Sequence, residues 1–261
     1  MKRLLLSLVF VLAFAMPSLA AQQHVTLTIG VTTFPHVDIM MVVKKLLAQE
    51  NITLILREFQ DYIQPNTALA DKELDANFFQ HIPYLEHVNE ENNLNFVWVA
   101  KVHIEPMGMY SRKIKTLDEL RKGDTIAVPD DPTNETRALR FLEKNGLIKL
   151  NQAALVTARD ITENPRELRF AAFKASQLPH ILPDVSAAAI NTNFAYEAGL
   201  TPSHDAIIVE GTDSSYANVV VVRKPDAHKP AFKALAKACN SPEVREFIVR
   251  RLQSSGIFPA F

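Results

Sequence analysis

Cysteine and glycine are scarce in this chain, and their scarcity excludes several kinds of protein. Cys239 is the single cysteine among 261 residues, so no disulfide can form within the chain. It lies in an apolar helical pattern, where a packed thiol is expected rather than a reactive one. Only 7 glycines occur, and there is no phosphate-cradling glycine pattern, Gly-x-Ser-x-Gly elbow or His-Glu-x-x-His motif. The sequence therefore carries no enzyme signature.

Long runs of one charge are also missing. The 28 basic and 29 acidic residues are mixed, and no basic run exceeds short pairs such as Arg250-Arg251, so no nucleic-acid partner is expected. Of the eight histidines, His81 and His87 are six positions apart, about 240° around a helix, so one helix cannot direct both at one metal ion. We therefore predict no metal site, and nothing indicates a cofactor. The 48% hydrophobic content predicts a globular chain.

The first twenty residues have the pattern of a cleavable secretory signal peptide. Lys2 and Arg3 precede an apolar run of 13 residues, and Ser18 and Ala20 supply the small residues expected before the cleavage point. A transmembrane anchor would need roughly 17 to 25 apolar residues. We expect an exported, mildly acidic mature protein.

The mature chain alternates strand-like and helix-like segments, which predicts largely parallel sheets covered by helices. This rhythm restarts after Tyr110, and the two C-terminal helices have no sheet of their own unless they return to the first unit. We therefore predict an α/β fold of two lobes, with a cleft that can close on a ligand. The predicted division is a signal peptide at 1–20, lobe 1 at 21–108 and 219–261, and lobe 2 at 109–218. Two chain crossings, near 104–110 and 215–219, join the lobes.

Residues 75–84, Asp-Ala-Asn-Phe-Phe-Gln-His-Ile-Pro-Tyr, combine three aromatic rings with a histidine and two amides. Small-molecule sites are apolar walls with a few aimed polar groups, although large aromatic residues also fill ordinary cores. On a strand, Phe78 and Phe79 must face opposite sides. We expect Phe79 and His81 to meet a ligand and Phe78 to pack inward.

Residues 130–137, Asp-Asp-Pro-Thr-Asn-Glu-Thr-Arg, precede and begin a helix that we expect at 135–145, stopped by Gly146. Asn134 and Arg137 are three positions apart and share a face. Free N–H groups at the helix start, together with a guanidinium that can bind a carboxylate through two bonds, indicate an anion site. Alternatively, Asn134 only caps the helix and Arg137 pairs with Glu135 or Asp131 in solvent.

Amides also follow two further strands, in Ile190-Asn-Thr-Asn193 and in Ser214-Ser-Tyr-Ala-Asn218. Ligands bind at strand ends in α/β sheets, and an amide can accept from an ammonium group or donate to a carboxylate. Turn formation or helix capping is the alternative for each.

Taken together and in this order, these segments resemble the NlpA/MetQ family, the methionine-binding periplasmic components of ABC importers. The resemblance covers most of the mature chain, and the Phe-Phe-Gln-His-x-Pro-Tyr and Asp-Pro-Thr-Asn strings are its most specific parts. The segments that carry it are 58–66, 75–84, 105–110, 129–134 with Arg137, 190–193 and 215–218.

The resemblance implies a periplasmic binding protein of the type II kind, with methionine or a methionyl dipeptide in the cleft. Arg137 would bind the substrate carboxylate, with Asn193 and Asn218 at the same polar end and Asn134 beside Arg137 on that wall. The thioether side chain would lie against Tyr62, Phe79, His81 and Tyr84. The implied partner is a membrane ABC permease.

Two features depart from the family pattern. The expected cleavage site, Ala-Ala-Gln-Gln, lacks the lipobox cysteine that family members usually carry, so we expect a soluble periplasmic protein rather than a lipoprotein. Phe34 stands where a small residue is expected after the first strand, which would narrow the cleft and change the ligand that fits.

The leading hypothesis is a non-catalytic binding protein that delivers L- or D-methionine, or a methionyl peptide, to its permease. A binding protein for another small amino acid or peptide is the first alternative, prompted by Phe34. A secreted interaction protein on the same fold is the second. An enzyme is the least favoured, because no nucleophile, base or metal set was found.

Overall fold

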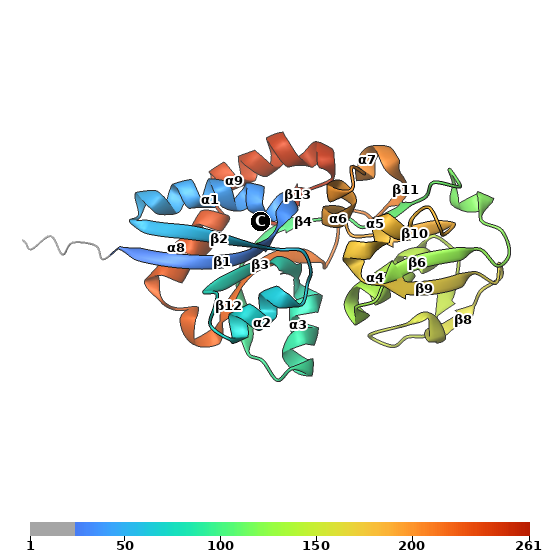
Figure 1. The fold of residues 1–261 in the computed structure, drawn as a ribbon, viewed down its shortest axis with the longest axis horizontal. Coiled ribbons are helices and arrows are strands. Elements are labelled where there is room, and N and C mark those ends of the chain that lie inside the picture. Colours follow the sequence, from blue (N-terminus) through green and yellow to red (C-terminus); the bar gives the residue numbers. More distant parts are fainter. Residues whose placement is uncertain (1–23) are drawn as a thin grey trace, which may run out of the picture.

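The computed structural model describes residues 24–261, so the predicted signal peptide at 1–20 lies outside the described residues. Two α/β lobes lie side by side along the long axis of the molecule (Figure 1). The predicted two-lobed α/β fold is confirmed. Within the described range, no helix has the length and apolar character needed to cross a membrane.

Lobe 1 is built on a six-stranded sheet with the strand order β13-β4-β12-β3-β1-β2. Strands β2 and β3 run parallel to β1, whereas β12 is antiparallel to both β3 and β4. The sheet is therefore mixed rather than parallel throughout, because β12 enters it from the side of lobe 2. Its strands are β1 (Val25–Thr32), β2 (Ile52–Phe59), β3 (Ala76–His81), β4 (Phe96–Ile104), β12 (Ala217–Arg223) and β13 (Phe258–Pro259).

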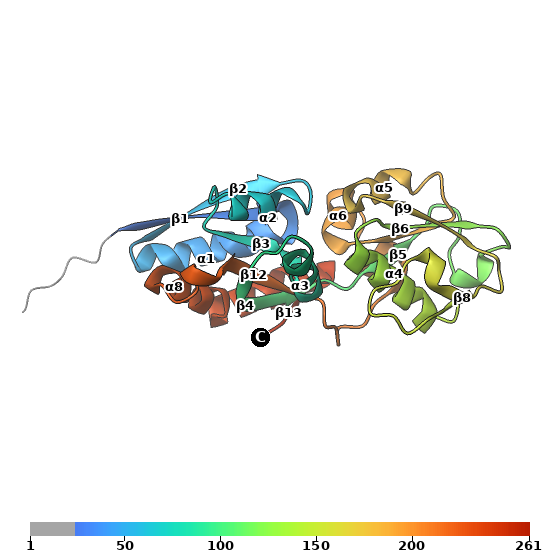
Figure 2. The same ribbon diagram turned by 90° about the horizontal axis from the view of Figure 1, so that it is seen from below.

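Helices cover both faces of this sheet (Figures 1 and 2). The run Val219-Val-Val-Val222 on β12 is apolar on both faces and so needs a cover on each. Val220 and Val222 pack into one core, and Val219 and Val221 pack into another. A strand buried on both faces reads as a continuous apolar run. The helices of lobe 1 are α1 (Asp38–Gln49), α2 (Gln64–Ala70), α3 (Ile82–Glu91), α8 (Pro230–Cys239) and α9 (Pro242–Phe247). Cys239 is buried in α8, as predicted.

Lobe 2 has a five-stranded sheet in the order β11-β5-β10-β6-β9, with β6, β9 and β10 parallel to one another. Its strands are β5 (Gly108–Tyr110), β6 (Thr125–Pro129), β9 (Arg169–Phe173), β10 (Ala187–Ile190) and β11 (Ala206–Val209). Its helices are α4 (Pro132–Lys144), α5 (Leu178–Ile181), α6 (Thr192–Glu197) and α7 (Pro202–Asp205), and a separate strand pair is formed by β7 (Lys149–Leu150) and β8 (Ile161–Glu163).

Helix α4 begins earlier than predicted. We expected it at 135–145, but Asp131 is its N-cap and Pro132 occupies its first turn. Asp and Pro are favoured at these two positions, so the turn formers read as a loop are in fact the helix start. The predicted stop at Gly146 is confirmed by its φ of 76°, a left-handed conformation that suits glycine.

The chain passes between the lobes twice. It leaves the first sheet after Ile104 and enters the second at Gly108, then leaves the second after Val209 and returns at Ala217. The predicted domain bounds are 21–108 with 219–261 for lobe 1 and 109–218 for lobe 2. They stay a prediction, because the residues at which strands begin and end do not by themselves define where a domain begins and ends. Both crossings run beside the pocket described next.

Candidate functional site

A pocket with an empty volume of about 360 Å³ lies between the lobes. All eight predicted site residues line it; whether they contact a ligand remains a prediction. The eight are Tyr62, Phe79, His81, Tyr84, Asn134, Arg137, Asn193 and Asn218. Four more lining residues were not among the predicted site residues, namely Gln80, Glu105, Asn191 and Thr192.

Aromatic rings form one side of the pocket. Tyr62, Phe79 and Tyr84 contact one another at centroid distances of 6.0 to 6.1 Å. The Tyr84 hydroxyl donates to the backbone carbonyl of Tyr62 at 2.9 Å, which fixes the two rings relative to each other. The predicted orientations of the two phenylalanines are confirmed, since Phe78 lies in the core of lobe 1 while Phe79 lines the pocket.

His81 ends β3 and connects the two lobes. Its Nδ1 accepts from the backbone N–H of Tyr84 at 3.1 Å, so the ring proton is on Nε2, which donates to Asn134 Oδ1 at 3.1 Å. Burial, and then the charge of Arg137, lower the pKa of His81 to about 3. His81 is therefore a neutral donor at physiological pH.

At the start of α4, the N–H of Asn134 is not free for an anion as we predicted. The Asp131 carboxylate already accepts from the backbone N–H of Asn134 at 2.9 Å and from its side-chain Nδ2 at 2.9 Å. The alternative that Asn134 caps the helix is also wrong, because Asp131 does so. The role of Asp131 is to hold the Asn134 amide, whose Oδ1 then accepts from His81 and from Asn191 Nδ2 at 2.9 Å.

Arg137 is buried and bonded on one edge. Its Nε and Nη2 donate to the Glu210 carboxylate at 3.0 and 2.5 Å, and Nη2 also donates to the backbone carbonyl of Glu105 at 2.7 Å. The ring of Tyr216 lies 4.4 Å from the guanidinium carbon. A solvent pairing with Glu135 or Asp131 is thus wrong. Glu210 occupies the edge of the guanidinium that we predicted to bind a ligand carboxylate through two bonds. Of the three guanidinium nitrogens, only Nη1 forms no hydrogen bond within the described part of the chain.

The amides after β10 leave two polar atoms unpaired. Asn193 Oδ1 accepts from the Tyr62 hydroxyl at 2.6 Å across the lobes, but its Nδ2 is buried without a partner among residues 24–261. The Oδ1 of Asn191 is likewise buried and unpaired in that range. An unsatisfied buried polar atom costs about 1 to 3 kcal/mol. These two amides therefore leave one donor nitrogen and one acceptor oxygen available for a ligand.

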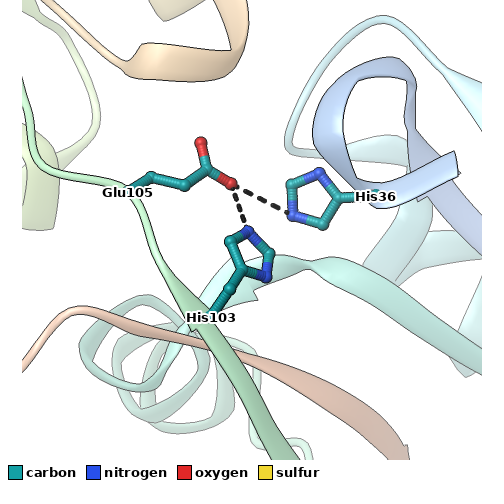
Figure 3. A group of neighbouring side chains, drawn as sticks. All are labelled: His36, His103 and Glu105. Carbon is teal, nitrogen blue, oxygen red and sulfur yellow. Dashed lines mark hydrogen bonds and ion pairs between the residues drawn. The ribbon is translucent and has the colours of Figure 1, made fainter. Parts of the chain in front are cut away.

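Glu105 meets two histidines beside the pocket (Figure 3). Its Oε1 lies 2.6 Å from His103 Nε2 and 3.5 Å from His36 Nε2. Burial lowers the pKa of His36 to about 4 and that of His103 to about 3, and burial raises the pKa of Glu105. The i, i+2 spacing of His103, on β4, and Glu105, just after that strand, was a readable signal, but nothing local indicated His36, 67 positions upstream.

These three residues have ligand atoms within 4.8 Å of one another and are of the types that hold divalent metals. However, 2.6 Å between two ligand atoms is a hydrogen-bond distance. A metal-bound histidine normally donates its second ring N–H, whereas His103 Nδ1 has no partner in the described chain. We assign the group to hydrogen bonding.

Phe34 does not line the pocket, contrary to our expectation that it narrows the cleft. Its ring stacks on Tyr196 of α6 with centroids 3.6 Å apart and an interplanar angle of 13°. A large residue is accommodated here because it packs between the lobes, outside the ligand space.

Comparison with known proteins matches residues 27–261 to the model of the NlpA lipoprotein family. Outer membrane lipoprotein 3 of Mannheimia haemolytica is 45% identical over 221 residues, covering 84% of each chain. The D-methionine-binding lipoprotein MetQ of Escherichia coli strain K12 is 43% identical over 192 residues, covering 72% of this chain and 71% of the relative. A nutrient-binding protein of Burkholderia cenocepacia, solved with methionine bound, is 42% identical with a TM-score of 0.87, covering 90% of this chain and all of that one.

Proposed function

The chain belongs to the NlpA lipoprotein family, and on that premise we propose that it is a periplasmic substrate-binding protein of an ABC importer. Its ligand is methionine, as the L- or the D-isomer, or a methionyl peptide, which it delivers to a membrane permease. A relative named for D-methionine binding and a solved relative with methionine bound support this choice.

The observation that carries the proposal is the division of the pocket into an aromatic side and an amide side with unpaired atoms. Methionine has the same division, with an apolar thioether at one end and two charged groups at the other. Each contact between sulfur and an aromatic ring contributes roughly 0.3 to 1.5 kcal/mol. The charged end supplies an acceptor for Asn193 Nδ2 and donors for Asn191 Oδ1.

We assign the carboxylate of the ligand to Nη1 of Arg137 and to Asn193, with Asn218 and Asn134 completing the polar end. The thioether lies against Tyr62, Phe79, His81 and Tyr84. The first alternative, a binding protein for another small amino acid or peptide, was prompted by Phe34. Because Phe34 lies outside the pocket, this residue no longer supports that alternative.

Calorimetry tests the proposal. The protein is unfolded, freed of any ligand it carries and refolded, and then titrated with L-methionine, D-methionine and a methionyl dipeptide. We expect saturable heat with at least one of them. The absence of heat with all three would refute the assignment to methionine, and mass spectrometry of the ligand released on unfolding would identify the replacement.

We also propose that the protein binds its ligand without converting it. Methionine incubated with a stoichiometric amount of protein should keep an unchanged NMR spectrum over hours. A new product that disappears on substitution of one pocket residue would contradict this.

The relatives are named lipoproteins, whereas the one cysteine of this sequence, Cys239, is buried in α8. Because a lipobox anchor is attached to a cysteine, we propose that this protein occurs in the periplasm without one. Intact mass spectrometry of the exported protein checks this, and an added diacylglyceryl mass would contradict it.

A further inference from the structure

Glu105 is a buried carboxylate that faces a ligand pocket. It follows β4 at the first crossing between the lobes, retains 6% of its surface and lines the pocket. The backbone N–H of Asn193 donates to its carboxylate, and Thr192 Oγ1 donates to the Pro106 carbonyl at 2.5 Å. The segment that carries Asn191 is therefore fastened directly to the residues around Glu105.

His103 donates an N–H group to this carboxylate, and His36 lies beside it. His103 Nδ1 has no partner in the described chain, so the proton of the neutral ring is on Nε2, 2.6 Å from Glu105 Oε1. The Thr32 hydroxyl lies 2.9 Å from His36 Nδ1, so the proton of this ring is also on Nε2, which donates to Asn218 Oδ1 at 3.3 Å and lies 3.5 Å from Glu105 Oε1. Figure 3 shows both rings directed at the same oxygen.

Neither histidine neutralises the negative charge of Glu105. Burial lowers the pKa of both rings far below 7, so they donate hydrogen bonds as neutral groups. The nearest permanent cation, Arg137, forms its ion pair with Glu210 and reaches only the backbone carbonyl of Glu105. Among the described residues, the carboxylate has hydrogen-bond donors but no ion-pair partner of its own.

A carboxylate has about four acceptor positions, and the His103 imidazole and one backbone N–H occupy two of them. The remaining positions, together with the unpaired Oδ1 of Asn191 in the same pocket, make a set of acceptors with a net negative charge. An ammonium group satisfies both, since it has three N–H donors and a positive charge. Arg137 Nη1 is the complementary donor for a carboxylate.

We infer that Glu105 binds the ammonium group of the ligand and makes a free amino group a requirement for tight binding. This inference rests on the proposed function and deepens it. His103 acts as a positioning residue, because it orients the carboxylate without neutralising it. The pocket then recognises an amino acid as a zwitterion, with one charged group of the ligand at Glu105 and the other at Arg137.

The first test uses the unmodified protein and two ligands of similar size. L-Methionine is compared with 4-(methylthio)butanoate, which has the thioether and the carboxylate but no amino group. Because a hydrogen bond to a charged group contributes about 1.5 to 3 kcal/mol, we expect affinity for the deaminated compound to be roughly 10- to 100-fold lower. Equal affinities would overturn the inference and leave the proposed function standing. No binding of methionine would overturn both.

The second test uses Glu105→Gln, which keeps the size of the side chain and removes its charge. We expect methionine affinity to fall roughly 10- to 100-fold, while affinity for 4-(methylthio)butanoate stays within about threefold, so that the preference for the amino group disappears. Glu163→Gln, at an exposed position of β8, is the control and should keep the preference. An unchanged preference in Glu105→Gln would overturn the inference.

The positioning role of His103 is tested with a pair of variants. His103→Gln keeps a neutral N–H donor, and His103→Leu removes it. We expect the preference for methionine over the deaminated compound to survive in His103→Gln and to weaken in His103→Leu. A role only in folding would lower the stability of His103→Leu without changing this preference, and that outcome would remove His103 from the inference.

Discussion

Arg137 is the single residue whose surroundings most limit what the pocket can bind. Glu210 occupies its Nε and one Nη2 proton, and the Glu105 carbonyl occupies the other. Glu210 is itself held by the backbone N–H of Met107 at 2.8 Å. A ligand therefore meets a guanidinium that cannot rotate and offers one nitrogen, which defines the direction from which a carboxylate approaches.

Arg137→Ala should weaken methionine binding by about 2 to 5 kcal/mol, because it removes the cation and leaves the partner charges buried without it. Calorimetry measures the loss. Arg140→Ala, one turn further along α4 and bonded to Glu143 outside the pocket, should leave the affinity within about threefold. Similar losses in the two variants would mean that the pocket does not use the charge of Arg137.

Three buried histidines should make stability depend on pH. The folded-state pKa values of His36, His81 and His103 are lowered to about 4, about 3 and about 3, from 6.5. Between pH 6.5 and 4 the unfolded chain binds more protons than the folded chain, so stability is fully present above pH 6.5 and falls as the pH is lowered. Each ring contributes a slope of about 1.4 kcal/mol per pH unit. The raised pKa values of Glu105 and Asp131 act in the opposite direction.

Urea unfolding between pH 4.5 and 7.5 measures this slope. His103→Gln should reduce it by about 1.4 kcal/mol per pH unit, and the exposed His204 gives a control in His204→Gln. Equal slopes in the wild type and in His103→Gln would show that His103 titrates normally in the fold.

At the level of elements, residue alternation on β3 and the amides after β10 could be read from the sequence, because strand geometry decides which side chains share a face. The start of α4 could not, since Asp, Pro and Thr are as common in turns as in helix starts. The contacts of Arg137 with Glu210 and Glu105 also could not be predicted from the sequence. They join residues 73 and 32 positions apart, and no local pattern specifies such distant partners.

Asp131→Ala removes the N-cap of α4 and should lower the free energy of unfolding by about 1 kcal/mol. It also frees the side chain of Asn134, so methionine affinity should fall roughly tenfold, the equivalent of one hydrogen bond. Chemical denaturation and calorimetry measure the two effects.

Ser241→Ala is the matched control. Ser241 caps α9 in the same way, by accepting from the Val244 N–H at 3.3 Å, but it does not line the pocket. We expect the same loss of stability and no loss of affinity. If both variants bind methionine like the wild type, the cap of α4 does not support the site.

On the scale of the whole molecule, the structure is a closed form in which the lobes touch on both sides of the ligand space. The Tyr62 hydroxyl reaches Asn193, His81 reaches Asn134, and Phe34 stacks on Tyr196. Two lobes were predictable from the order of strands and helices. Their closure was not, because a side chain such as Tyr196 carries no sequence signal for a partner 162 positions away.

The stack between Phe34 and Tyr196 should favour the closed form. Phe34→Leu and Tyr196→Leu should each weaken methionine binding without touching the pocket, and a double-mutant cycle should give a coupling of about 0.5 to 1.5 kcal/mol, as for other aromatic pairs. Additive effects of the two substitutions on the binding free energy would show that the stack does not contribute to closure.

The return of the chain through β12 has a consequence for the order in which the protein folds. β12 lies between β3 and β4 in the middle of the first sheet, yet all strands of the second sheet precede it in the chain. During synthesis or export, lobe 2 can therefore fold while lobe 1 still lacks its central strand. Pairing β12 with β3 closes a loop of more than a hundred residues, which is slow. Asn218 arrives on that strand, so the ligand site is completed only in this last, slow step.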